Sequence, residues 1–265
     1  MTETFLLIDT SYTIFYRFFA TKRWYSFAHS DDKFDEDYNW SENELFKTMF
    51  NKKYFDSFSN FINTHTIQKD HIIFVKDCPR KDIWRNKYYD KYKSNRASNN
   101  SIGHFFNTTY KLINDAEHKL IEFDTLEADD CIYLTKQYIQ KKHPNSKIIV
   151  ITSDEDLLQL IDENTLLYNL QNKCLNIKST GDRKLDLELK IICGDKSDNI
   201  NPCFSRCGRK TALKLYNNNS LLLDKFRQFP ESLNIYSLNK ILIDLENIPE
   251  DLVKAFNVYI KEINL

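Results

Sequence analysis

Short apolar runs alternate with stretches of helical periodicity along the first two thirds of the chain. Three of these runs, over residues 5–8, 72–75 and 148–151, are followed within three residues by the aspartates Asp9, Asp77 and Asp154. Short β-branched runs between helices are typical of buried parallel strands. From about residue 186 onward the pattern is almost wholly helical. The chain is therefore predicted to form an α/β core with a central, mainly parallel sheet flanked by helices, followed by a helical region.

The same pattern places the individual elements. After the first strand we expect a helix over residues 11–20, capped by Ser11, and then an irregular, acid-rich segment over 21–44. Further helices are predicted over 42–64, 101–117 and 126–142, and strands over 71–77, 119–123, 147–153 and 166–170. The polar stretch 94–100 is expected to be a mobile loop. We expect residues 1–182 to form the core and residues 183–265 the helical region.

Composition narrows the class of protein. Among 265 residues, 42% are hydrophobic, which is typical of a globular chain. The six cysteines show no regular spacing, and the chain shows no signal peptide, so we expect reduced thiols and a cytoplasmic protein. We also expect a monomer. No apolar run reaches the ~18–20 residues of a membrane span. A zinc site at Cys193, Cys203 and Cys207 is an alternative that lacks a fourth ligand.

Charge is unevenly distributed behind a net value of −1. Residues 76–96 carry eight basic side chains against three acidic ones, and a second basic island contains Arg206, Arg209, Lys210 and Lys214. Basic loops beside an acidic pocket suit a polyanion whose backbone must be held. The alternative is ordinary solvated surface charge.

Carboxylates are the candidate chemical groups. Ligand sites of parallel sheets lie beyond the carboxyl ends of the strands, so the acids at the strand ends should meet there. Two denser acidic clusters, over 126–130 and 194–198, add to them. The full set is Asp9, Asp77, Glu127, Asp129, Asp130, Asp154, Asp156, Asp195 and Asp198. Acids in a first helical turn also commonly cap helices. So many carboxylates without zinc-site histidines favour a pair of Mg²⁺ or Mn²⁺ ions.

The order of these motifs resembles that of the flap endonuclease and 5′-nuclease family. The matching blocks are Asp9, V-K-D ending at Asp77, Y-K-S-N-R over 92–96, L-E-A-D-D over 126–130, T-S-D-E-D over 152–156 and G-D-K-S-D-N over 194–199. The similarity is closest to phage 5′-exonucleases and the 5′-nuclease domain of bacterial DNA polymerase I. It extends over roughly residues 4–217.

The resemblance implies a PIN-like core with two divalent metals. Asp9, Asp77, Glu127, Asp129 and Asp130 would serve one metal, and Asp154, Asp156, Asp195 and Asp198 the other. Lys93 would stabilise the reacting phosphate, assisted by Arg85 and Arg96. Tyr92 would stack on a terminal base, or simply pack. The helical arch of the family, at about residues 85–118, would be short here.

A helix–hairpin–helix (H3TH-like) element is implied after the second acidic cluster. Gly208, Lys210 and Thr211 match the family pattern, whereas Cys203 and Arg206 replace glycines whose backbone normally approaches DNA and a K⁺ ion. The replacements argue against the K⁺ ion. Arg206 and Arg209 are expected to contact phosphate through their side chains instead.

We therefore expect a metal-dependent nuclease that cuts near a 5′ end, flap or junction of DNA, or RNA in a DNA hybrid. The alternatives are a catalytically silent DNA-junction-binding protein and a PIN-type ribonuclease.

Overall fold

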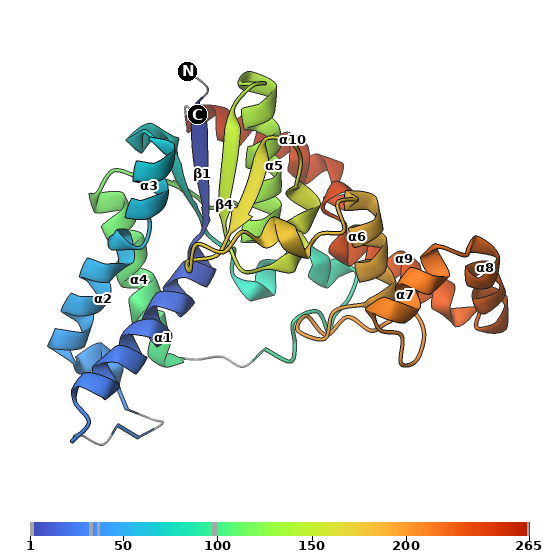
Figure 1. Cartoon of the computed structure of the whole chain (residues 1–265), viewed down its shortest axis with the longest axis horizontal. Coiled ribbons are helices and arrows are strands. Elements are labelled where there is room, and N and C mark those ends of the chain that lie inside the picture. The colour runs from blue at the N-terminus through green and yellow to red at the C-terminus, as the bar shows by residue number, and fades with distance from the viewer. Residues whose placement is uncertain (1–2, 32–33, 36–37, 97–99, 264) are drawn as a thin grey trace.

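The computed structural model describes residues 3–31, 34–35, 38–96, 100–263 and 265. At its centre lies a five-stranded sheet of order β3-β2-β1-β4-β5, in which every strand pair is parallel (Figure 1). The strands are β1 (Thr4–Asp9), β2 (Ile72–Val75), β3 (Lys119–Ile121), β4 (Lys147–Ile151) and β5 (Thr165–Tyr168). The predicted α/β class and parallel sheet are confirmed.

The sheet is buried on both faces, which explains why its strands are continuous apolar runs. Alternate residues of β1 point to opposite faces, with Phe5 and Leu7 in one core cluster and Leu6 and Ile8 in the other. The first cluster is completed by α5 (Ala128–Lys142) and α10 (Glu250–Glu262). The second is covered by α1 (Thr10–Ala28), α2 (Glu44–Asp56), α3 (Ser59–His65) and α4 (Asn100–Asp115).

The first helix differs from its prediction. Its N-cap is Asp9, whose side chain accepts a hydrogen bond from the Tyr12 amide, rather than Ser11. The helix also continues to Ala28, so residues 21–28 are not irregular. Thr21 and Tyr25 are buried in this extension, so tertiary packing maintains a helix whose sequence has no clear polar face. The helix expected over 42–64 is divided into α2 and α3.

The helical region predicted after the sheet is present. It consists of α6 (Arg183–Cys193), α7 (Arg209–Tyr216), α8 (Asn219–Gln228) and α9 (Glu231–Ile243), which share their own apolar cluster, and then α10. Figure 1 shows α7 and α8 projecting to one side of the sheet. The last helix returns, because Phe256 and Ile260 belong to the core cluster of β1 and β4. The division at residues 182 and 183 stays a prediction, since α10 packs with the N-terminal part.

No helix in the described part of the chain combines the length and the apolar character that crossing a membrane requires.

Candidate active site

The three strand-end aspartates meet as the pattern predicts. Asp9, Asp77 and Asp154 line one pocket of about 560 Å³ at the carboxyl edge of the sheet, together with Asp129 and Asp195. The order of the sheet explains this, because β1 lies between β2 and β4 and all three strands point the same way. From β1 the chain adds β2 and β3 on one side of the sheet and then β4 and β5 on the other side. A crevice forms at the carboxyl edge where the strand order switches in this way.

Local hydrogen bonds fix the first two carboxylates. Asp9 accepts from the Tyr12 amide at 3.0 Å and from the Thr152 hydroxyl at 3.0 Å. Asp77 accepts from the Ser11 hydroxyl at 2.5 Å and from the Ala128 amide, at the N-terminus of α5, at 2.8 Å. The carboxylates are thus held in place by the elements that follow the strands.

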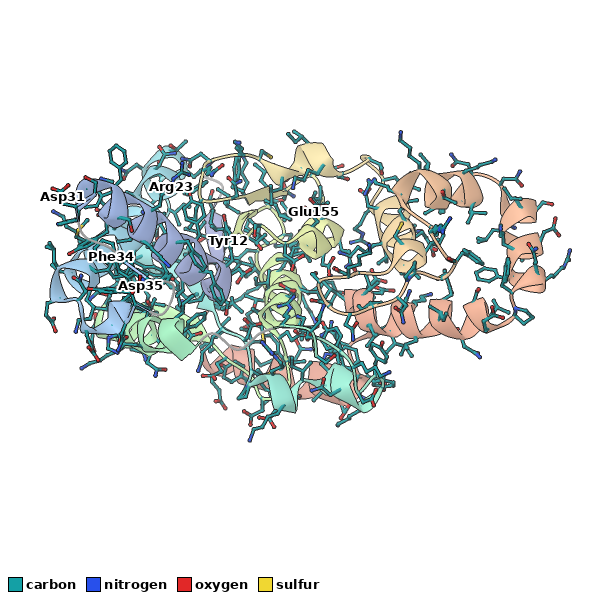
Figure 2. The ribbon with its side chains drawn as sticks, turned by 90° about the horizontal axis from the view of Figure 1, so that it is seen from below. Tyr12, Arg23, Asp31, Phe34, Asp35 and Glu155 are labelled. Atoms are coloured by element: carbon teal, nitrogen blue, oxygen red, sulfur yellow. The ribbon has the colours of Figure 1, made fainter. Side chains whose placement is uncertain are left out.

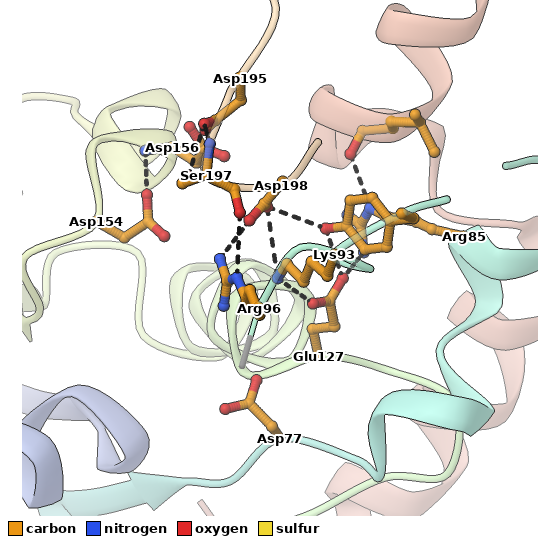
Figure 3. Close-up of polar contacts among 12 residues, drawn as sticks. Asp77, Arg85, Lys93, Arg96, Glu127, Asp154, Asp156, Asp195, Ser197 and Asp198 are labelled. Atoms are coloured by element: carbon orange, nitrogen blue, oxygen red, sulfur yellow. Dashed lines mark hydrogen bonds and ion pairs between the residues drawn. The ribbon is translucent and has the colours of Figure 1, made fainter. Parts of the chain in front are cut away.

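A second group of carboxylates comes from the loop after β4 and the loop after α6. Asp156, Asp195 and Asp198 each present an oxygen within 4.8 Å of the others (Figure 3). Asp154 caps the short 3-10 helix Glu155–Leu160 and accepts from the Asp156 amide at 2.8 Å. This geometry gives oxygen ligands of the kind that hard divalent cations prefer.

Burial and mutual repulsion perturb these acids. Burial, together with the charges of Asp77 and Asp154, raises the pKa of Asp9 to about 7. Burial and the charge of Asp154 raise the pKa of Asp156 to about 7, and burial and Asp154 also raise the pKa of Asp129. The ionised carboxylates of the pocket therefore repel one another, and additional positive charge would reduce this repulsion.

Two of the expected ligands are held by Arg85. Glu127 and Asp130 form a capping box at the start of α5, and Arg85 contacts Asp130 at 2.7 Å and Glu127 at 2.9 Å. Its Nε also donates to the carbonyl of Leu242. Arg85 is only 3% exposed. Arg85, Asp130 and Glu127 do not line the pocket, and in this structure Arg85 is engaged by the two carboxylates. Direct assistance by Arg85 at the phosphate stays a prediction.

The Y-K-S-N-R block lies on the other side of these acids. The Lys93 ammonium contacts Glu127 and, at 3.5 Å, Asp198, while Arg96 contacts Asp198 (Figure 3). Burial lowers the pKa of Lys93, but Glu127 and Asp198 outweigh this effect and raise it overall. Both Lys93 and Arg96 line the pocket.

Tyr92 does not have a face free for stacking. It is 6% exposed, and its hydroxyl donates to Glu127 at 3.0 Å. This environment favours the alternative of ordinary packing, and stacking on a terminal base stays a prediction.

Lys190 is a site residue that the sequence reasoning missed. Its ammonium lies 2.5 Å from Asp156 and 2.7 Å from Asp195, and it lines the pocket. The signal was a single cation in the apolar last turn of a helix, L-K-I-I-C, five residues before an aspartate of the acidic cluster.

The hairpin residues lie along a neighbouring groove of about 610 Å³. Arg206, Gly208 and Arg209 line it at one part and Asp156 and Lys190 at another, so the groove adjoins the acidic pocket. Arg209 contacts Asp186 at 3.0 Å, whereas Lys210 and Thr211 are exposed at the start of α7.

The cysteines of the hairpin have a packing role. Cys203 and Cys207 are buried in the apolar cluster of α6–α9. Among the described residues, the side chains close enough together to bind a metal ion are the carboxylates Asp156, Asp195 and Asp198. Asn239 donates to the carbonyls of Ile191 and Asn201, which ties the hairpin to α9.

The predicted arch, at about residues 85–118, is described over residues 85–96 and 100–118. Residues 97–99, which belong to the loop expected over 94–100, lie outside the described residues. On one side of this gap are turns up to Arg96, and on the other is α4, which packs against α1 through Phe106 and Phe15.

Comparisons with known proteins show which family the chain resembles. A family model for the N-terminal resolvase-like domain of 5′-3′ exonucleases matches residues 4–186. A 5′-3′ exonuclease of Buchnera aphidicola is 28% identical over 196 residues, covering 71% of this chain and 67% of that protein. One of Aquifex aeolicus is 33% identical over 196 residues, covering 66% of each. The chain thus spans about two thirds of the length of these relatives.

A solved structure extends the likeness to the rest of the chain. The flap endonuclease of bacteriophage T5, in a complex with DNA and metal ions, has a TM-score of 0.68 at 16% identity and covers 98% of this chain and 99% of its own. The likeness shows that the fold is shared. The family match over residues 4–186 contains all five strands and the carboxylates from Asp9 to Asp156, and the chain therefore belongs to the 5′-3′ exonuclease family.

Proposed function

We propose that this chain is a divalent-metal-dependent 5′-3′ exonuclease and flap endonuclease that hydrolyses phosphodiesters near 5′ ends of DNA. The observation that carries the proposal is the pocket at the carboxyl edge of the sheet, where clustered carboxylates are rimmed by Lys93, Arg96 and Lys190. A polyanion would enter such a pocket only if cations neutralised the carboxylates.

The carboxylates of the pocket, together with the adjoining Glu127, Asp156 and Asp198, fit two Mg²⁺ or Mn²⁺ ions. The donor atoms are carboxylate oxygens, three of them within 4.8 Å of one another. Burial and, after it, repulsion from neighbouring carboxylates raise the pKa values of Asp9 and Asp156, and bound cations would relieve that repulsion. We propose Asp9, Asp77, Asp129 and Glu127 around one ion and Asp154, Asp156, Asp195 and Asp198 around the other. When bound, such ions supply an activated water and neutralise charge on the phosphate.

The chain's own cations would hold and polarise the scissile phosphate. Lys93 is fixed by Glu127 and Asp198, so its ammonium would be preorganised for negative charge that develops in the transition state. The Arg96 side chain is 42% exposed, which leaves part of its guanidinium able to contact phosphate. Lys190 would hold the phosphate from the part of the pocket next to Asp156 and Asp195. Arg85 and Asp130 would be positioning residues, because Arg85 pairs with both Glu127 and Asp130, and Asp130 accepts a hydrogen bond from the Glu127 amide.

The groove lined by Arg206, Gly208 and Arg209 would hold the duplex next to the scissile phosphodiester. Arg206, Gly208, Arg209, Lys210 and Thr211 would contact the DNA backbone, and an RNA strand in a DNA hybrid would present the same phosphates. The T5 flap endonuclease was crystallised with DNA and metal ions, which supports this substrate class. We propose that the protein acts as a monomer, without a K⁺ ion in the hairpin.

The double substitution Asp154→Asn and Asp156→Asn tests this proposal. Cleavage of a 5′-labelled duplex with a flap should be lost in Mg²⁺, because metal ligands are removed, whereas binding should be kept or improved since repulsion toward phosphate falls. Asp162→Asn is a matched control, because Asp162 pairs with Lys136 outside the pocket.

Three outcomes would contradict the proposal. Cleavage by the double variant at more than about a tenth of the parental rate would refute the metal assignment. A parental protein that binds the junction but does not cut in Mg²⁺ would be a silent binder. Cutting of single-stranded RNA in preference to the DNA flap would identify a PIN-type ribonuclease.

A further inference from the structure

An exposed row of planar side chains runs along α1. Phe15, Phe19, Trp24 and Phe27 are 41%, 51%, 52% and 86% exposed. They are three to five residues apart and lie on successive turns of the helix, with Tyr16 and Arg23 between them and Tyr12 one turn before Phe15 (Figure 2 labels Tyr12 and Arg23). Large aromatic groups that stay exposed in a folded domain commonly mark an interaction site.

The row is continuous with the acidic pocket. Tyr12 and Phe15 line that pocket, and the side chains from Tyr16 to Phe27 line a second hollow of about 910 Å³. The two are joined through Tyr12 and Tyr16, whose ring centroids are 6.0 Å apart. A strand that leaves the pocket along α1 would therefore pass from one ring to the next.

The charge of α1 favours an anionic occupant. The helix contains Arg17, Lys22 and Arg23 and no acidic residue. Arg17 donates to the Ser57 hydroxyl and Lys22 lies over the Trp40 ring, whereas Arg23 is exposed and lines the hollow. Two exposed acids, Asp31 and Asp35, belong to the segment that follows the helix (both are labelled in Figure 2).

We propose that this face, defined by Tyr16, Phe19, Arg23, Trp24 and Phe27, binds the unpaired bases of a single nucleic-acid strand that extends from the acidic pocket. Bases stack on aromatic rings and on guanidinium groups without regard to sequence, and Arg23 adds attraction for phosphate. Residues 15–27 span about 18 Å of helix, the length of about five stacked nucleotides. The proposal rests on the nuclease function proposed above and adds a subsite for single-stranded extensions.

Trp24 provides a direct readout. Of the three tryptophans, Trp40 and Trp84 are each 1% exposed, so a stacked base would quench the fluorescence of Trp24 alone. Titration with oligo(dT) of twelve nucleotides in EDTA should quench this emission, and Trp24→Leu should abolish the quenching. In fluorescence anisotropy with labelled oligo(dT), Phe19→Ala combined with Phe27→Ala should weaken binding at least about tenfold, since each stacking contact contributes about 1–3 kcal/mol.

The control and the polarity of the strand are tested in the same assay. Ile177→Ala changes a side chain that is 85% exposed, like Phe27, but lies outside the face, and it should leave the affinity unchanged. Duplexes with a 5′ or a 3′ single-stranded extension identify which strand occupies the face. The duplex whose extension occupies the face should bind the double variant more weakly than the parental protein. A blunt duplex should bind both proteins equally.

Because binding in EDTA needs no metal, its failure is separable from failure of the nuclease proposal. A protein that cleaves flaps but shows neither quenching nor an effect of the double variant overturns the single-strand subsite alone. A dimer in sedimentation velocity that becomes monomeric in the double variant also overturns it, because the face would then bind a second copy of the chain.

Discussion

At the scale of single residues, the carboxylates of the pocket serve local structure and the site together. Asp9 caps α1, Asp154 caps a 3-10 helix, and Asp77 accepts from the first amide of α5. A carboxylate has two oxygens with about four lone-pair sites, so it can accept hydrogen bonds from the protein and keep lone pairs for a ligand in the pocket. Helix capping and metal binding are therefore compatible explanations for these residues, and the cap restricts the rotamer that a ligand would need.

Lys93→Met tests the proposed role of the buried ammonium. Turnover of a flap substrate should fall by ~10²-fold or more with a smaller change in KM, because a fixed charge that faces developing negative charge acts mainly in the transition state. Steady-state kinetics in saturating Mg²⁺ measure both constants.

Lys136→Met is the matched control for Lys93. Lys136 is also buried and paired, at 2.6 Å from Asp162, but it lies outside the pocket. Its loss should lower the melting temperature without lowering turnover of the folded protein. Normal turnover with a raised KM in Lys93→Met would reduce Lys93 to a phosphate clamp.

At the scale of elements, α6, the hairpin and α7 form one unit beside the pocket. α6 carries Lys190 toward Asp156 and Asp195, and the hairpin returns to α6 where the Cys203 amide donates to the Ile192 carbonyl. Arg206 adopts a φ of 55°, in the region that usually favours glycine. An arginine thus occupies a backbone position suited to the glycine that it replaces, and its exposed side chain is added to the groove.

Arg206→Ala combined with Arg209→Ala tests whether side chains replace backbone contacts in this unit. Duplex affinity should fall uniformly across sequences, and the log–log slope of affinity against salt should flatten by about one unit for each phosphate that is no longer neutralised. Because Arg209 also pairs with Asp186, Asp186→Asn is the control for indirect effects through that ion pair. The measurement is fluorescence anisotropy between about 50 and 200 mM salt.

Potassium gives an independent check on the hairpin. Replacing Na⁺ by K⁺ at equal ionic strength should leave duplex affinity unchanged. A gain specific to K⁺ would mean that the loop keeps a cation despite Cys203 and Arg206.

At the scale of the whole molecule, the acidic pocket should make the metal-free fold sensitive to pH. Asp9 and Asp156 have pKa values of about 7 in the folded protein, above the ~3.9 of an unfolded aspartate. Between these values the folded state holds more protons than the unfolded state. The free energy of unfolding should therefore fall as pH rises from about 4 through 7, and Mg²⁺ should restore it at pH 8.

Urea unfolding in EDTA at pH 5, 6, 7 and 8 measures this dependence. The fall should become shallower in a variant that carries Asp9→Asn and Asp156→Asn. In contrast, Asp162→Asn should leave the slope unchanged in this range, because hydrogen bonds from Lys136 and Gln140 hold the pKa of Asp162 at about 2 despite its partial burial. A melting temperature that does not respond to millimolar Mg²⁺ would argue against the metal site.

The sequence by itself determined the class of the fold and the edge at which the acids meet. Buried parallel strands are short apolar runs, and such runs all point one way in an α/β sheet, so their C-terminal aspartates must share an edge. The periodicity also separated the helical region from the sheet. These are consequences of patterns that are local in the chain.

Only the tertiary structure decided which charged groups pair. Arg85 and Lys93 lie in the same basic segment, yet Arg85 is buried against Asp130, whereas Lys93 lines the pocket. Tyr92, next to Lys93 in the chain, is buried. The continuation of α1 to Ala28 and the placement of Lys190 between two aspartates likewise depend on residues distant in the chain. Ion pairing and burial arise from the distances between elements, and a one-dimensional pattern does not contain those distances.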